Sequence, residues 1–190
     1  NDDYAIFTGA RRAGKEWQEF KAANDNKQII KLSELDDANA IAENAMCNPI
    51  FKKLMQNKVH TEKEVRWNHA GIDFKGFVDL ESKIGGRTIV CDIKTTTDAG
   101  KRFQRDLIYN DYKMQAAMYL ENYDEADYYI IAVETTSPYN VQVYRLGYNI
   151  ISQGYIEYCN LVNKYNSWNG EAVGYSKDII DIEIEEQILI

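Results

Sequence analysis

Apolar side chains in the first third of the chain recur every three or four residues, which is the spacing of one helix face. Ser33, followed by Asp36 and Asp37, resembles a capped helix start. Pro49 suits the first turn of a further helix. The pattern predicts helices over residues 13–24, 33–48 and 49–57.

From His60 the period changes to two, and β-branched and aromatic residues become frequent. This alternation is typical of strands that place one face on a core. Gly85 and Gly86 predict a tight hairpin turn between the second and third strands. We expect strands over residues 60–67, 72–81, 87–96, 127–136 and 140–147.

Two further helical segments follow, one over residues 103–122 between the third and fourth strands and one over residues 149–165. This order predicts an α/β fold with a central mixed sheet and helices on both faces. A chain of 190 residues has the length of one domain, and it shows no internal repeat. We therefore expect a single domain with a helical N-terminal part, a sheet-and-helix part and a C-terminal helix with its tail, at residues 1–58, 59–146 and 147–190.

The acidic tail from Asp178 is expected to add a strand or to cover a neighbouring element. No apolar run approaches the roughly 20 residues of a membrane helix, so no membrane partner is expected. Cys47, Cys91 and Cys159 lie far apart and match neither a zinc site nor a disulfide framework, which fits a reducing cytoplasm. The net charge of −8 argues against non-specific coating of nucleic acid.

Three charged residues interrupt the second and third strands. Asp92 and Lys94 share one strand face, and Ile93 is expected to point the other way, into the core. The hairpin brings Asp79 to the same end of the strand pair. Two carboxylates that approach one point repel each other unless a cation compensates, and oxygen ligands suit Mg²⁺, with Mn²⁺ as the alternative. Lys94 then lies close enough to assist an attacking water and to offset charge on a phosphate. The alternative is a surface salt-bridge cluster at a sheet edge.

Tyr112, Gln115 and Tyr119 fall three and four residues apart and so share one face of the predicted helix. The Gln115 amide lies on a half-apolar stripe and needs a hydrogen-bond partner. A phosphate or a metal-bound water is one expected partner. The alternative is a polar boundary residue on an ordinary amphipathic helix.

These motifs stand in a characteristic order: Gly-x-x-Asp at 76–79, Asp-Ile-Lys-Thr-Thr at 92–96 and Tyr-x-x-Gln-x-x-x-Tyr at 112–119. The order resembles the PD-(D/E)xK nuclease superfamily, and in particular its RecB-like and exodeoxyribonuclease VIII (RecE-like) phage enzymes. Residues 11–22 and 60–67 are also similar to this branch, so the resemblance covers most of the chain. It implies a restriction-endonuclease-like core.

The resemblance implies a Mg²⁺-dependent phage-type exonuclease that hydrolyses DNA at linear duplex ends for recombination. It also implies a cytoplasmic location, in a bacterial host or encoded by a phage, with a single-strand annealing protein as partner and a ring-shaped homo-oligomer. A non-catalytic DNA-binding or assembly subunit and a structure-specific endonuclease are the alternatives.

The resemblance assigns roles to individual residues. Metal binding falls to the carboxylates of Asp79 and Asp92 and the main-chain carbonyl of Ile93, and catalysis to Asp79, Asp92, Lys94, Gln115 and Tyr119.

DNA-backbone contacts are expected from four basic residues, Lys75, Lys101, Arg102 and Arg105. A solvated helix start is the other interpretation of positions 101–105. Glu62 matches an acidic position without a fixed role. It alternatively belongs to a solvated face with Glu64 and Arg66.

Relatives of this branch carry a metal-ligating histidine on a helix upstream of the segment that matches the start of this chain. His60 and His69 match no such position, and we expect both to be surface residues. Either the natural protein extends beyond Asn1 or the metal site is incomplete, and we expect the first.

Overall fold

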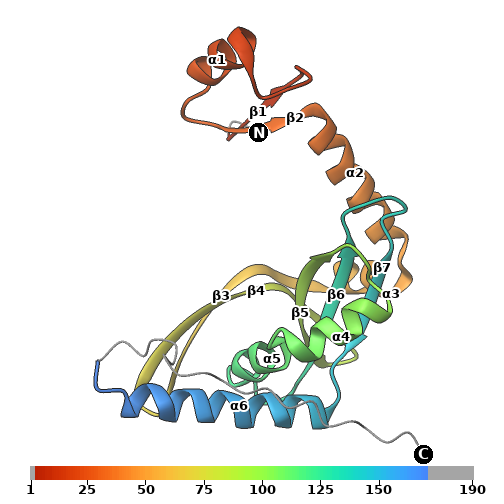
Figure 1. Cartoon of the computed structure of the whole chain (residues 1–190). Helices are drawn as coiled ribbons and strands as arrows, with labels where there is room; N and C mark the ends of the chain where they lie inside the picture. The colour runs from red at the N-terminus through yellow and green to blue at the C-terminus, as the bar shows by residue number, and fades with distance from the viewer. Residues whose placement is uncertain (1–2, 171–190) are drawn as a thin grey trace, which may run out of the picture.

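A five-stranded sheet forms the centre of the molecule in the computed structural model, which describes residues 3–170 (Figure 1). Its strands lie in the order β3-β4-β5-β6-β7, and only β5 and β6 run parallel. The five expected strands are confirmed, with bounds of Lys58–His69 (β3), Ile72–Ile84 (β4), Arg87–Thr96 (β5), Ala126–Glu134 (β6) and Val141–Arg145 (β7).

The turn between β4 and β5 has the conformation that the glycine pair predicts. Gly85 and Gly86 both have positive φ angles, of 60° and 83°. Ile84 pairs with Arg87 across this two-residue loop. Positive φ at both central residues is the requirement of the tightest hairpin turn, and glycine meets it without strain. The turn therefore fixes the register in which β5 returns along β4.

Helices cover both faces of the sheet, as the fold class predicts (Figure 1). The end of α2 (Leu32–Cys47) and α3 (Pro49–Gln56) pack on one face, where Leu54 meets a cluster that includes Leu80 and Cys91. On the other face, α4 (Lys101–Tyr109) and α5 (Tyr112–Leu120) pack on Val90 and its neighbours. The last helix, α6 (Tyr148–Ser167), lies against α5.

The N-terminal part is not purely helical, which corrects the prediction for residues 1–58. Strands β1 (Tyr4–Phe7) and β2 (Gln28–Lys31) pair in parallel, and α1 (Gly14–Ala23) lies between them in the sequence. In Figure 1 this unit stands at the far end of α2, away from the main sheet. Each strand has only four residues, which is too short for alternation to be recognised in a sequence.

The helix expected over residues 103–122 is two helices. The chain turns between α4 and α5 at Asn110 and Asp111, where Asp111 adopts a left-handed φ of 56°. Short polar side chains tolerate this conformation better than most. The turn gives α5 its own direction over the sheet.

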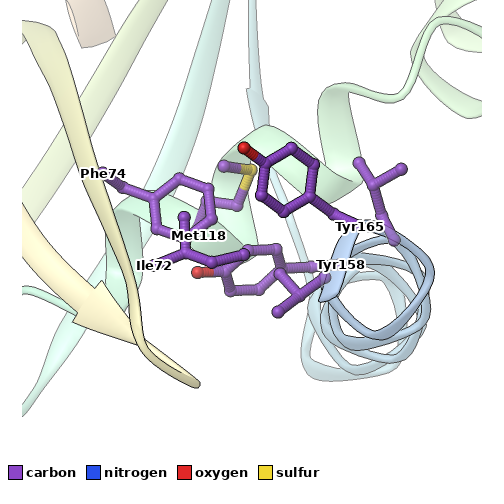
Figure 2. A pocket seen from close by; sticks show the side chains of 7 residues that line it. Ile72, Phe74, Met118, Tyr158 and Tyr165 are labelled. Atoms are coloured by element: carbon purple, nitrogen blue, oxygen red, sulfur yellow. The ribbon is translucent and has the colours of Figure 1, made fainter. Parts of the chain in front are cut away.

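Helices α5 and α6 cross closely because Gly154 has no side chain. A Cβ atom at this position would lie 2.1 Å from the main-chain oxygen of Lys113. Toward the end of α6 an apolar hollow of about 250 Å³ opens (Figure 2). Ile72 and Phe74 from the β3–β4 hairpin line it, together with Met118 and Tyr158. None of the expected site residues lines this hollow.

Among residues 3–170, no helix combines the length and the apolar character that crossing a bilayer requires. The strand expected in the acidic tail lies outside the described residues.

Gly154→Ala should destabilise the protein, although alanine is the better helix former by about 1 kcal/mol. The added methyl group forces two main chains apart, so we expect a loss of about 2 kcal/mol or more in the free energy of unfolding. Urea denaturation measures this loss. Gly147→Ala is the matched control, because its Cβ meets open space and a change within about 1 kcal/mol is expected. Equal stability of both variants would contradict the close crossing.

Candidate active site

The pairing of β4 with β5 ends at Leu80 and Cys91, while β5 continues to pair with β6 as far as Thr96. Asp79 and Asp92 are the first residues beyond the last β4–β5 pair. The Oδ2 atom of Asp79 accepts a hydrogen bond of 2.6 Å from the main-chain N–H of Ile93. The Asp79 carboxylate thus takes the place of a strand partner where the two strands separate.

Asp92 is a buried carboxylate, with 3% of its surface exposed. Its Oδ1 atom accepts a hydrogen bond of 2.9 Å from the Gln115 amide on α5. Its Oδ2 atom lies 2.7 Å from the Lys94 ammonium, but it makes no hydrogen bond of standard geometry. One buried carboxylate oxygen therefore retains the capacity to accept a further ligand.

Burial raises the pKa of Asp92 above its ordinary value, and the nearby charge of Asp79 acts in the same direction. Lys94 and Gln115 oppose this rise because both stabilise the ionised form. A buried acid beside a second acid, a cation and an amide is the kind of arrangement that marks functional sites.

Ile93 does not point into the core as expected, since 40% of its surface is exposed. The helices that cover Ile89 and Cys91 on this face of β5 do not bury it. The N–H and C=O groups of one strand residue point to the same side of the strand. Because the Ile93 N–H reaches Asp79, its carbonyl faces the same side.

Tyr119 packs against Gly76, three residues before Asp79. A Cβ at position 76 would lie 2.5 Å from the Tyr119 ring, so the glycine makes room for the aromatic side chain. The ring also meets Trp67 edge-on, with 6.2 Å between centroids. The Gly76 position of the first motif and the Tyr119 position of the last motif are therefore in contact.

Lys94 is held from two directions. Its ammonium contacts Asp92 and lies 5.0 Å above the ring centroid of Tyr112 at the start of α5. Cation–π contacts of this kind contribute on the order of 1 kcal/mol. The structure thus brings Asp79, Asp92 and Lys94 together with Gln115, in agreement with the order of the sequence motifs.

The four basic residues expected to contact DNA fall into two groups. Lys75 pairs with Glu64 at 3.0 Å and lies over the ring of Phe77. Lys101, Arg102 and Arg105 are exposed on α4, opposite its buried apolar residues, and have no ion-pair partner among residues 3–170. The α4 group is therefore a cationic surface that is free to accept an anion.

Glu62 is exposed and lies between two paired positions of β3 whose partners on β4 flank Asp79. The pairs of Thr61 with Leu80 and Lys63 with Val78 enclose it, but the described ladder contains no Glu62–Asp79 pair. Glu62 has a left-handed φ of 49°, which is unusual for a residue other than glycine. On the neighbouring strand, Val78 and Leu80 pack on opposite faces of the sheet, although residues two apart on a regular strand share a face.

The two histidines differ. His60 is exposed as expected, but His69 is half-buried, because Glu121 contacts its Nδ1 atom at 2.7 Å and the ring of Tyr158 lies beside it. The surface position predicted for His69 is therefore wrong. The partners come from the end of α5 and from α6, and a lone histidine carries no sign of such distant neighbours.

Tyr128 is a polar residue of the site that the sequence did not indicate. It is 1% exposed, and its hydroxyl has no hydrogen-bond partner among the described residues. Burial raises its pKa, and the charge of Asp92 raises it further. Tyr128 pairs with Val90 across the parallel strands β5 and β6, and this pairing brings it near Asp92. The pairing cannot be recognised from the sequence, so Tyr128 could not be predicted.

Within residues 3–170, no group of three or more His, Cys, Asp or Glu side chains is arranged to hold a metal ion. Protein ligands in this region would be limited to two carboxylates, with main-chain or water oxygens in the other positions.

Gln115→Leu should destabilise the protein by about 2 kcal/mol, because it removes a hydrogen bond from a buried carboxylate. Urea denaturation at neutral pH measures the change. Gln153→Leu, at an exposed position on α6, is the matched control and should shift stability by less than about 0.5 kcal/mol. If the two variants were equally stable, the amide would not support Asp92.

The fold is shared with a known protein of solved structure. A solved structure of a candidate exonuclease from Eubacterium rectale is similar, with a TM-score of 0.60 and 17% identity. The match covers 83% of this chain and 64% of that protein, and at this identity it shows a shared fold. A second structure, of SSO0001, has a TM-score of 0.36 and 19% identity over 63% of this chain and 57% of that one, which is too weak to carry an argument.

No curated protein matches the sequence. A family model matches residues 8–174, and its description is "PDDEXK-like domain of unknown function". The chain belongs to this PDDEXK-like family, within the PD-(D/E)xK superfamily.

Proposed function

We propose that the protein is a metal-dependent deoxyribonuclease and, more specifically, an exonuclease that acts on the ends of linear duplex DNA. The observation that carries the proposal is the meeting of Asp79 and Asp92 where β4 separates from β5, with Lys94 in contact with Asp92. The family and the similar fold of a candidate exonuclease support it.

The donors at this point fit a hard divalent cation such as Mg²⁺ or Mn²⁺. Asp92 has a buried oxygen without a hydrogen bond, and Asp79 faces the same main-chain segment. The Ile93 carbonyl is a third oxygen on that side. Such an ion, when bound, would activate water as a nucleophile and polarise the scissile phosphate.

The chain's own residues have distinct roles in this proposal. Gln115 holds one oxygen of Asp92, so that the other oxygen keeps its direction. The Lys94 ammonium, within reach of the same centre, offsets negative charge on the phosphate and orients the attacking water. Lys101, Arg102 and Arg105 bind backbone phosphates with their exposed cations.

The finer parts of the proposal come from the resemblance to RecE-like phage enzymes. They are a role in recombination, a single-strand annealing protein as partner, a ring-shaped homo-oligomer and a location in the cytoplasm. Two further residues are part of the proposal, Tyr119 as a site residue and Lys75 as a contact of the DNA backbone.

A second candidate function is a DNA-binding or assembly subunit without turnover. The absence of a third acidic or histidine ligand near Asp79 and Asp92, among the described residues, favours it. It predicts DNA binding that no metal converts into hydrolysis. A structure-specific endonuclease is a third possibility, and covalently closed circular DNA separates it from an exonuclease.

Asp92→Asn should lower the hydrolysis of linear duplex DNA by at least about 100-fold, because a carboxylate that holds the metal is lost. The full-length protein is assayed with Mg²⁺ or Mn²⁺ by release of acid-soluble nucleotides. Asp124→Asn, at an exposed position, is the matched control and should retain full activity.

Closed circular DNA should stay intact under the same conditions. Hydrolysis that persists in Asp92→Asn would refute the site assignment. Binding of DNA without any metal-dependent hydrolysis by the unmodified protein would instead favour the subunit without turnover.

A further inference from the structure

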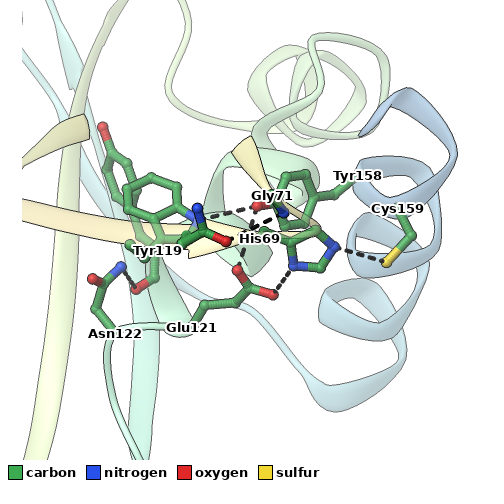
Figure 3. Close-up of polar contacts among 9 residues, drawn as sticks. His69, Gly71, Tyr119, Glu121, Asn122, Tyr158 and Cys159 are labelled. Carbon is green, nitrogen blue, oxygen red and sulfur yellow. Dashed lines mark hydrogen bonds and ion pairs between the residues drawn. The ribbon is translucent and has the colours of Figure 1, made fainter. Parts of the chain in front are cut away.

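A second cluster of reactive side chains lies between β3, α5 and α6 (Figure 3), and it includes neither Asp79 nor Asp92. His69 ends β3, Glu121 follows the last residue of α5, and Cys159 lies within α6. The Glu121 Oε1 atom lies 2.7 Å from His69 Nδ1, and His69 Nε2 lies 3.8 Å from the Cys159 sulfur. A thiol, an imidazole and a carboxylate thus stand in one line.

The Glu121 carboxylate determines which ring nitrogen of a neutral His69 carries the proton. An ionised carboxylate only accepts hydrogen bonds, so Nδ1 must be the protonated nitrogen. Nε2 then presents its lone pair to the Cys159 sulfur. In this tautomer the thiol S–H donates to Nε2, and the imidazole is placed to take the thiol proton.

Neighbouring hydroxyl and indole groups hold this arrangement in place. The Tyr158 hydroxyl contacts the second oxygen of Glu121 at 3.4 Å and accepts a hydrogen bond from the Trp67 indole at 3.0 Å. The neighbouring Cys159 side chain raises the pKa of Tyr155. The sulfur therefore has the imidazole as its hydrogen-bond partner and the Tyr155 side chain nearby.

The sulfur is not sealed in the core. Cys159 is half-buried, and Tyr155, which contacts it, is exposed. A hollow of about 410 Å³ beside Glu121 and Tyr155 opens between α5 and α6. Neither His69 nor Cys159 lines this hollow, so a small reagent reaches the sulfur through the half-buried surface of Cys159 itself.

We propose that Cys159 is a reactive thiol and a modification site for hydroperoxides, with His69 as its base and Glu121 as the positioning residue. Nucleophile, base and orienting carboxylate are the parts that activate thiols in general. Nothing in this proposal depends on nuclease activity.

The reaction is balanced with hydrogen peroxide as the oxidant. The thiol proton passes to His69 Nε2, and the sulfur attacks one peroxide oxygen. An S–O bond forms as the O–O bond breaks, and the departing oxygen takes the proton from the imidazolium. The products are a sulfenic acid and water, so the sulfur is oxidised by two electrons and the peroxide is reduced by two.

The other two cysteines are internal controls. Cys47 is exposed on α2 and reports the rate of an ordinary accessible thiol. Cys91 is 1% exposed, and burial raises its pKa to about 12. Cys91 should stay unlabelled in the native protein, so its labelling would reveal unfolding.

The test is competitive labelling of the full-length native protein at neutral pH, with the adducts on each cysteine counted by peptide mass spectrometry. Iodoacetamide should modify Cys159 about tenfold faster than Cys47, despite the lower exposure of Cys159. Limiting hydrogen peroxide followed by dimedone should place the sulfenic acid adduct on Cys159.

Glu121→Gln tests the positioning role, because a glutamine amide can donate to Nδ1 and turn the lone pair away from the sulfur. The Cys159 rate should fall to that of Cys47 or below, while Glu125→Gln, a matched exposed change, alters neither rate. His69→Asn should give the same loss. Simple loosening of the structure would act in the opposite direction, since it exposes the sulfur and speeds its labelling. The proposal is wrong if Cys159 reacts no faster than Cys47, or if Glu121→Gln fails to slow it.

Discussion

The candidate active site depends on the place where β4 stops pairing with β5 while β5 remains paired with β6. A strand that loses one neighbour leaves main-chain donors without partners, and such donors are costly to bury. Asp79 supplies the missing acceptor to the Ile93 N–H, which brings its charge next to Asp92. Separation of the strands and convergence of the carboxylates are thus one event, and each requires the other.

Burial of Asp92 is tolerated because two neighbouring side chains compensate its charge. Lys94 follows on the same strand face, and Gln115 reaches in from α5. A buried ion pair contributes little net stability once desolvation is counted. The cluster is therefore better explained by chemistry than by folding, and stability is the weaker reason for these residue types to stand there.

Much of this arrangement could be predicted from the sequence, because it follows from short-range rules. The glycine pair determines the hairpin, the hairpin determines the register, and the register puts positions 79 and 92 at one end. Gln115 needed a partner by its place on a half-apolar stripe, although that partner is the Asp92 carboxylate and not the expected phosphate or metal-bound water. The five strands followed from their alternation.

What escaped prediction depends on contacts between distant segments or on single dihedral angles. Asp111 divides one predicted helix by a left-handed turn, and the neighbouring residues in the sequence do not predict this turn. Ile93 looks like a core residue by its alternation, but the covering helices do not bury it. His69 meets Glu121 and Cys159 across 52 and 90 positions of the chain, and no local pattern records such a meeting.

Helix α5 connects the candidate active site with the His69–Cys159 cluster. Gln115 near its start binds the buried carboxylate, and Glu121 just after its end binds the imidazole. Its nine residues are also pressed against α6 at Gly154, which leaves the helix little freedom to slide. A shift of this helix at one cluster would therefore also move the residue that it supplies to the other cluster. Substitutions at the two clusters should for this reason have non-additive effects on the free energy of unfolding.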